Sequence, residues 1–184
     1  VDAPVEALSC SRKHDFIPKS IEAIGPREYK FMSSFSFAMC CIKSMVFGSK
    51  AKLDARFIDE VAVNGLKAEA KNGYISTNDI ITSAFSRATK SDILLMAINL
   101  RKRVKEADEM DAGNYSLVVL HDAESSASPS GIRQVLNGGP PFVRKNGRLP
   151  GFLKTIKARV SMITSWAFPH FDADIKLCNA DGEN

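Results

Sequence analysis

The chain has few cysteines, and none of them has metal-binding spacing. The four lie at Cys10, Cys40, Cys41 and Cys178, with no C-x-x-C pair among them. This excludes a cysteine-based zinc site and predicts thiols that serve as small apolar residues in a reducing compartment, cytoplasmic or otherwise intracellular. The first residues also lack the charged and apolar pattern of a secretory leader.

Long apolar runs and strong charge of one sign are missing as well. No run approaches the 18 or so residues that span a bilayer, so we expect no membrane span. Lysine and arginine total 25 against 21 acidic residues, a net charge of +4. The densest basic run is 101–103, followed by Lys105, and it lacks interleaved aromatics. We therefore expect no nucleic-acid partner.

What is present is an ordinary globular composition. Of the 184 residues, 45% are apolar and 25% are charged, which is enough for one domain with a real core. Residues 1–26 carry three prolines and no periodicity, and we interpret them as an arm or linker. Residues 27–184 are predicted to form a single α/β domain.

Aromatic alternation is the first periodic signal. Tyr29, Phe31, Phe35 and Phe37 all lie at odd-numbered positions, and Ser33 takes the place of an aromatic residue between them. This alternation predicts a strand over 29–37, with strand character resuming over 42–47. A further short strand is predicted over 53–58.

Capping residues predict the helices that follow. Asp59 is a suitable N-cap for a helix over 60–70, whose apolar face would use Val61, Ala62 and Leu66. Ser76 and Asp79 have capping-box spacing, so we expect a helix over 77–88. Its apolar face would use Ile80, Ile81, Ala84 and Phe85.

The rest of the chain alternates strands and helices. The continuous apolar run 93–98 has strand length and predicts a central strand buried on both faces. Later elements are predicted as a strand over 115–121, helices over 128–136 and 149–157, and a strand over 160–166. This order predicts a mixed sheet flanked by helices.

Five short phrases occur in a recognisable order. They are R-F-I-D and G-L-K-A around one helix, G-Y-I-S-T-N-D at 73–79, A-I-N-L-R-K-R at 97–103, A-G-N-Y at 112–115 and I-T-S-W at 163–166. The series resembles the BAHD acyltransferases of the chloramphenicol-acetyltransferase-like superfamily and covers roughly 53–174. The resemblance implies a chloramphenicol-acetyltransferase-like half domain, the C-terminal half. The chain would then be a fragment of a larger protein whose missing N-terminal half completes the same fold.

Two departures from the family pattern bear on activity. The family's D-F-G-W-G motif is replaced after Asp174 by I-K-L, and its catalytic H-x-x-x-D belongs upstream of the matched region. His170 and Asp174 do spell H-x-x-x-D, but they follow the tryptophan strand instead of preceding it. His170 is therefore more simply a loop histidine than a catalytic base.

The resemblance also implies roles for individual residues. Trp166 would direct its indole N–H at an oxyanion, with Thr164 lining the pocket, although Trp166 also suits a core position. Asn78 and Asn114 would touch the ligand, or else serve a helix start and a turn. Arg101 would form a structural pair with Asp174.

Two functions remain open from the sequence. One is non-catalytic binding of a hydrophobic small molecule on an acyltransferase-like scaffold. The other is half of an active CoA-dependent acyltransferase, with a CoA thioester as donor and an alcohol or amine as acceptor. The stretch 9–30 also resembles the luciferin-binding proteins of dinoflagellates, which release their chromophore on acidification. That resemblance would make His14, His121 and His170 pH sensors, whereas the plainer expectation is exposed histidines without a role.

Overall fold

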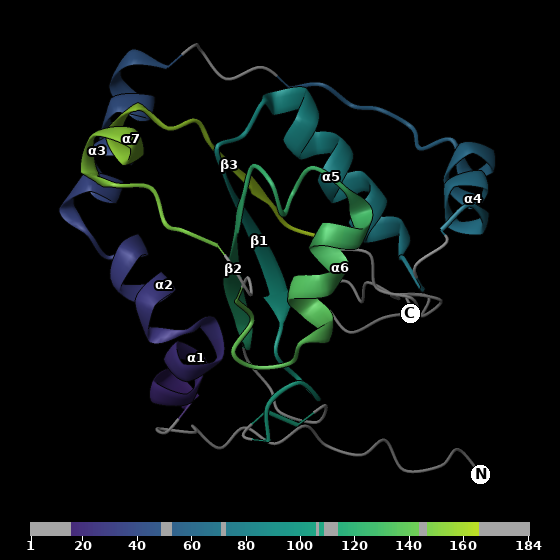
Figure 1. The fold of residues 1–184 in the computed structure, drawn as a ribbon, viewed down its shortest axis with the longest axis horizontal. Helices are drawn as coiled ribbons and strands as arrows, with labels where there is room; N and C mark the ends of the chain where they lie inside the picture. Colours follow the sequence, from purple (N-terminus) through teal and green to yellow (C-terminus); the bar gives the residue numbers. More distant parts are fainter. Residues whose placement is uncertain are drawn as a thin grey trace, which may run out of the picture.

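A three-stranded mixed sheet forms the centre of the computed structural model (Figure 1). The structure describes residues 16–48, 53–70, 73–105, 107–108, 114–143 and 147–165. The strands are β1 (Ile93–Asn99), β2 (Ser116–Asp122) and β3 (Val160–Ile163), in the order β2-β1-β3. β1 pairs with β2 antiparallel and with β3 parallel. The predicted α/β class and the central position of the 93–98 run are confirmed.

β1 is buried on both faces because its side chains alternate between two cores. Leu94, Met96 and Ile98 pack with α6 (Pro129–Asn137) and α1 (Phe16–Ile24). Ile93 and Leu95 pack on the other side. Their partners come from α2 (Pro26–Met32), α3 (Phe35–Phe47) and the residue that follows α7 (Phe152–Lys157).

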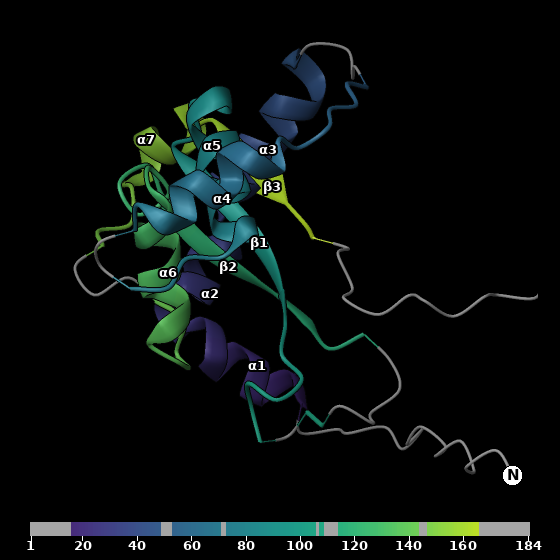
Figure 2. The same ribbon diagram turned by 90° about the vertical axis from the view of Figure 1, so that its right-hand side faces the viewer.

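The helices form two groups with the sheet between them. α3 and α7 lie to one side in Figure 1, and α5 (Thr77–Thr89) and α6 lie to the other. α4 (Glu60–Ala68) sits on the outer side of α5 in both views (Figures 1 and 2). Among the described residues, no helix is long and apolar enough to cross a membrane.

The strands predicted over 29–37 and 42–47 are wrong, because these residues form α2 and α3. The aromatic alternation breaks between Phe31 and Phe35, and that spacing of four matches a helix as well as a strand. Pro26 occupies the first turn of α2, and the Ser34 hydroxyl accepts from the Phe37 N–H to cap α3. Local capping therefore decides against the strand.

Two further expectations near the N-terminus also fail. Part of the predicted arm, from Phe16 to Ile24, is the helix α1, in which Ala23 and Ile24 are buried. Residues 53–58, predicted as a strand, have no regular secondary structure, and Leu53 and Phe57 are fully exposed.

The capped helices begin where they were predicted to begin. Asp59 accepts from the N–H groups of Val61 and Ala62, and α4 ends at Ala68. Its predicted apolar face is wrong, because Val61 and Leu66 are exposed and Val63 is buried. The capping box of Ser76 and Asp79 is present in full and starts α5.

The buried face of α5 differs from the predicted one. Ile80 is buried as expected, but Ala84 is exposed, and the remaining buried positions are polar: Asp79, Thr82, Ser83 and Ser86. A helix that turns polar side chains inward needs polar partners across the interface. α6 and the turn after β2 supply some of them.

The last elements are close to their predictions, although α7 and β3 are shorter than predicted. α6 begins after Ser128, whose hydroxyl accepts from the Gly131 N–H. α7 begins at Phe152 and β3 ends at Ile163. Large apolar side chains stay exposed on α3, α7 and β3, namely Phe35, Ile42, Met45, Val46, Phe47, Phe152, Leu153 and Met162.

Candidate functional site

A groove of about 640 Å³ runs between the 73–75 segment and α6. This volume falls in the range of small-molecule sites. One part of its lining is apolar or aromatic, with Tyr74, Ile75, Val135 and Val143. The other part is polar, with Asp122, Glu124, Ser125, Ser128, Ser130, Arg133, Gln134 and Asn137. A ligand here would meet both apolar and hydrogen-bonding side chains.

The serine-rich turn after β2 forms a rigid side of the groove. The Asp122 carboxylate accepts from the Ser125 N–H at 2.8 Å, and the Ser125 hydroxyl accepts from the Asp122 N–H at 3.1 Å. The Ser126 hydroxyl donates to the Asp122 carbonyl at 2.7 Å. Gly131 packs so closely that a Cβ atom there would lie 2.4 Å from the Ser125 carbonyl oxygen. The turn and the first turn of α6 are therefore fitted to each other.

An ion pair joins α6 to α5 at the base of the groove. Arg133 donates from Nε at 2.8 Å and from Nη2 at 2.6 Å to Oδ2 of Asp79. The Asp79 side chain is 1% exposed and the Arg133 side chain 19%, so the carboxylate is inside and the guanidinium reaches the groove. The Tyr74 ring covers the guanidinium, with the Arg133 Cζ 5.3 Å from the ring centroid.

The polar face of α5 continues this site into the interior. The Ser86 hydroxyl donates to the Ser126 hydroxyl at 2.7 Å, which links α5 to the serine-rich turn. Asp79 Oδ1 and Thr82 Oγ1 are buried and have no hydrogen-bond partner among the described residues. We call the set Asp79, Thr82, Ser83, Ser86 and Ser126 the polar seam. A buried polar group without a partner is destabilising, so the seam is a costly feature for the fold to retain.

The ligand-binding residues expected from the sequence do not form one site. Thr164 is exposed just beyond β3, and Asn78 is half-buried in the first turn of α5. Asn114 is exposed, and its side-chain oxygen accepts from the Ser116 N–H, which is the turn role. No hydrogen bond between described residues joins any two of the three.

Arg101 lies at the end of β1 against an aromatic ring. Its Cζ is 4.9 Å from the centroid of the Tyr115 ring, and its backbone N–H donates to the Asn99 side chain. This contact gives Arg101 a packing role. Its predicted pairing with Asp174 lies outside the described residues.

His121 is fully buried on β2, opposite Leu94 in the sheet register. The expectation of an exposed histidine is therefore wrong for this residue, and a pH-sensing role stays a prediction. His14, Trp166 and His170 lie outside the described residues, so their predicted roles stay predictions as well.

The two described cysteines differ in environment. Cys40 is fully buried and donates to the Ala158 carbonyl at 3.2 Å, whereas Cys41 is half-buried. Burial raises the pKa of the Cys40 thiol, although the nearby Lys43 opposes the rise. No group of three metal-ligating side chains occurs within the described residues.

Arg133 and Tyr74 were not identified from the sequence. A cation between the buried Ile132 and the exposed Gln134 of an amphipathic helix is typical of a solvent-facing position. Its partner Asp79 lies 54 positions earlier, and the capping box already accounted for that carboxylate. The one local signal was the row of serines before α6, which predicted a helix start rather than a groove.

Comparison with protein-family models, with curated proteins and with solved structures finds no match for this chain. The acyltransferase and luciferin-binding resemblances therefore stay predictions from the sequence phrases.

Proposed function

We propose that this chain is a non-catalytic binding protein for a mainly apolar small molecule that carries one polar or acidic group. The supporting observation is the groove of about 640 Å³, whose lining combines apolar side chains with Arg133, several serines and the carboxylates of Asp122 and Glu124. The apolar side chains favour a hydrophobic body, and the guanidinium favours an oxygen-bearing group.

The arrangement of Arg133 supports binding over catalysis. Two of its donors are committed to Asp79, and the Tyr74 ring covers its guanidinium. A side chain fixed in this way orients a ligand without reorganising, which lowers the entropic cost of binding.

Titration with anilinonaphthalene sulfonate tests the proposal, because this fluorophore combines an apolar body with an anionic group. We expect saturable binding that weakens several-fold in Tyr74→Ala and in Ser130→Trp, which fills the groove. Tyr74 is 75% exposed, so its removal leaves the core intact.

The matched control is Met45→Ser on α3, which removes an 85% exposed apolar side chain outside the groove. If Met45→Ser weakens the signal and the groove variants do not, the fluorophore binds exposed apolar surface instead. That result would remove the support for a ligand in the groove.

The alternative is that the chain is one half of an active CoA-dependent acyltransferase. It is favoured by the apolar surface on the edge strand β3 and on α3 and α7, where Met162, Phe47 and Leu153 are exposed. Such a surface is typical of a buried interface with a second unit. We expect the chain alone to release no free CoA from an acyl-CoA thioester, and steady release would overturn the binding proposal.

A further inference from the structure

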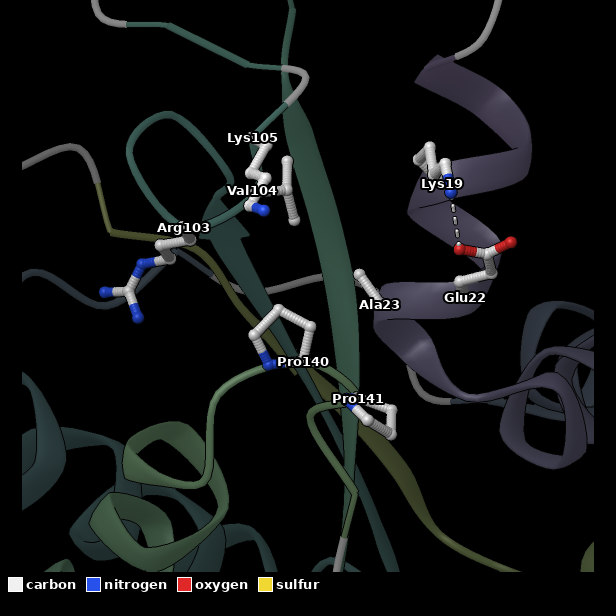
Figure 3. A pocket seen from close by; sticks show the side chains of 8 residues that line it. All are labelled: Lys19, Glu22, Ala23, Arg103, Val104, Lys105, Pro140 and Pro141. Atoms are coloured by element: carbon white, nitrogen blue, oxygen red, sulfur yellow. Dashed lines mark hydrogen bonds and ion pairs between the residues drawn. The ribbon is translucent and has the colours of Figure 1, made fainter.

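A second cavity lies beside α1, has none of the groove's lining residues and differs from the groove in character. It has a volume of about 430 Å³, and Figure 3 shows it between α1, the loop after β1 and the Pro140–Pro141 segment. Its apolar lining residues are Ala23, Val104, Pro140 and Pro141. Its charged lining residues are Lys19, Glu22, Arg103 and Lys105, so positive charge is in excess.

The loop that carries two of these cations is a compact, hydrogen-bonded turn. The Leu100 carbonyl accepts from the N–H groups of both Arg103 and Val104, at 2.9 and 3.2 Å. The Lys102 N–H donates to the Ala107 carbonyl at 3.0 Å, and Leu100 and Ala107 are both buried. These bonds hold the backbone that carries the cations against the core.

Backbone strain in this loop supports a role beyond connection. Lys102 has φ of 62°, a left-handed conformation that is unfavourable for a side chain other than glycine. Strain of this kind persists where surrounding structure enforces it, and it concentrates at ligand-binding sites.

The opposite wall is fixed as well. The Phe142 N–H donates to the Ala23 carbonyl at 2.7 Å, which holds the proline segment against α1. Lys19 forms an ion pair with Glu22 at 3.2 Å on the α1 side of the cavity. Arg103 and Lys105 are exposed, and no hydrogen bond or ion pair links their side chains to another described residue. Both residues line the cavity, so a ligand can reach their side chains.

We propose that this cavity binds a phosphate group carried on an apolar body. The cations come from two separate segments, which favours a group with more than one negative charge over a single carboxylate. The apolar lining residues favour an organic phosphate over free phosphate. This site is independent of the groove beside Arg133 and does not rest on the function proposed for it.

Three probes test the separate parts of the proposal: phenyl phosphate, inorganic phosphate and phenol. Their binding is measured from two-dimensional ¹H–¹⁵N spectra of the ¹⁵N-labelled chain. We expect saturable shifts at the amides of 102–105 and 19–23 with phenyl phosphate, weaker ones with inorganic phosphate and none with phenol. Equal affinity for phenyl phosphate and inorganic phosphate would overturn the role of the apolar lining.

The double variant Arg103→Ala and Lys105→Ala should lower the affinity for phenyl phosphate at least about tenfold, because it removes two charged donors. Both residues are exposed, so folding should be unaffected. The control is Lys154→Ala, which removes an exposed lysine from α7, away from the cavity. Equal losses in the control, or no saturable shift at 102–105 in the unmodified chain, would overturn the proposal.

Discussion

Replacement of Arg133 by methionine should be among the most destabilising single changes near the groove. The substitution keeps an unbranched side chain but removes both hydrogen bonds to Asp79, at 2.8 and 2.6 Å. It leaves a carboxylate whose side chain is 1% exposed with the Ser76 N–H as its remaining donor to Oδ2. Stranding a buried charge in this way costs about 3–5 kcal/mol.

The double variant Asp79→Asn with Arg133→Met separates the charge from the packing. Asparagine keeps an acceptor for the Ser76 N–H but leaves no unpaired charge in the interior. We expect the double variant to lose only about 1–2 kcal/mol, so it should be more stable than Arg133→Met alone.

Urea unfolding followed by far-ultraviolet circular dichroism measures these differences. Arg87→Met is the control, because this exposed arginine on α5 makes one hydrogen bond, to the Ala127 carbonyl. We expect it to cost less than about 1 kcal/mol. If Arg133→Met costs no more than the control, or the double variant is no more stable than Arg133→Met, the buried ion pair is not what joins α5 to α6.

Four further predictions concern local features. Ser76→Ala removes the hydroxyl that accepts from the Asp79 N–H and should cost about 1 kcal/mol of unfolding free energy in urea melts. Gly131→Ala should lower the thermal midpoint although alanine favours helix, because its Cβ would lie 2.4 Å from the Ser125 carbonyl oxygen; a raised midpoint would contradict this packing. Iodoacetamide should modify Cys41 before Cys40, checked by peptide mass spectrometry, since burial raises the pKa of the Cys40 thiol above 9.0. The Cys40 thiol of the folded chain therefore keeps its proton to higher pH than that of the unfolded chain. Its contribution to stability should be complete below about pH 9 and should decline as the pH rises through the raised pKa. The Cys40→Ala variant should show a weaker decline in stability over this pH range.

The sequence predicted best where a local signal was sufficient. The continuous apolar run of β1 and the caps at Asp59, Ser76 and Ser128 each place an element correctly. These signals act within a few residues and leave little for tertiary structure to decide.

The sequence predicted poorly where the same residues fit both a helical and a strand periodicity. It also predicted poorly where interacting residues are far apart in the chain. The spacing of Phe31 and Phe35 fits a helix as well as a strand, and the choice was wrong. The candidate site depends on Asp79 meeting Arg133 and Ser86 meeting Ser126 across 54 and 40 positions. No periodicity encodes such pairs, because they exist only once α5 and α6 have packed.

The pairing of β1 with β3 has a consequence for the order of folding. Asp92 and Arg159, at the start of this ladder, are 67 positions apart, so the chain must close a long loop before any of its hydrogen bonds can form. β1 and β2 follow each other directly and pair along their whole length. We therefore expect β3 to join the sheet last and leave it first. In native-state hydrogen exchange, the amides of β3 should be the earliest of the sheet to exchange.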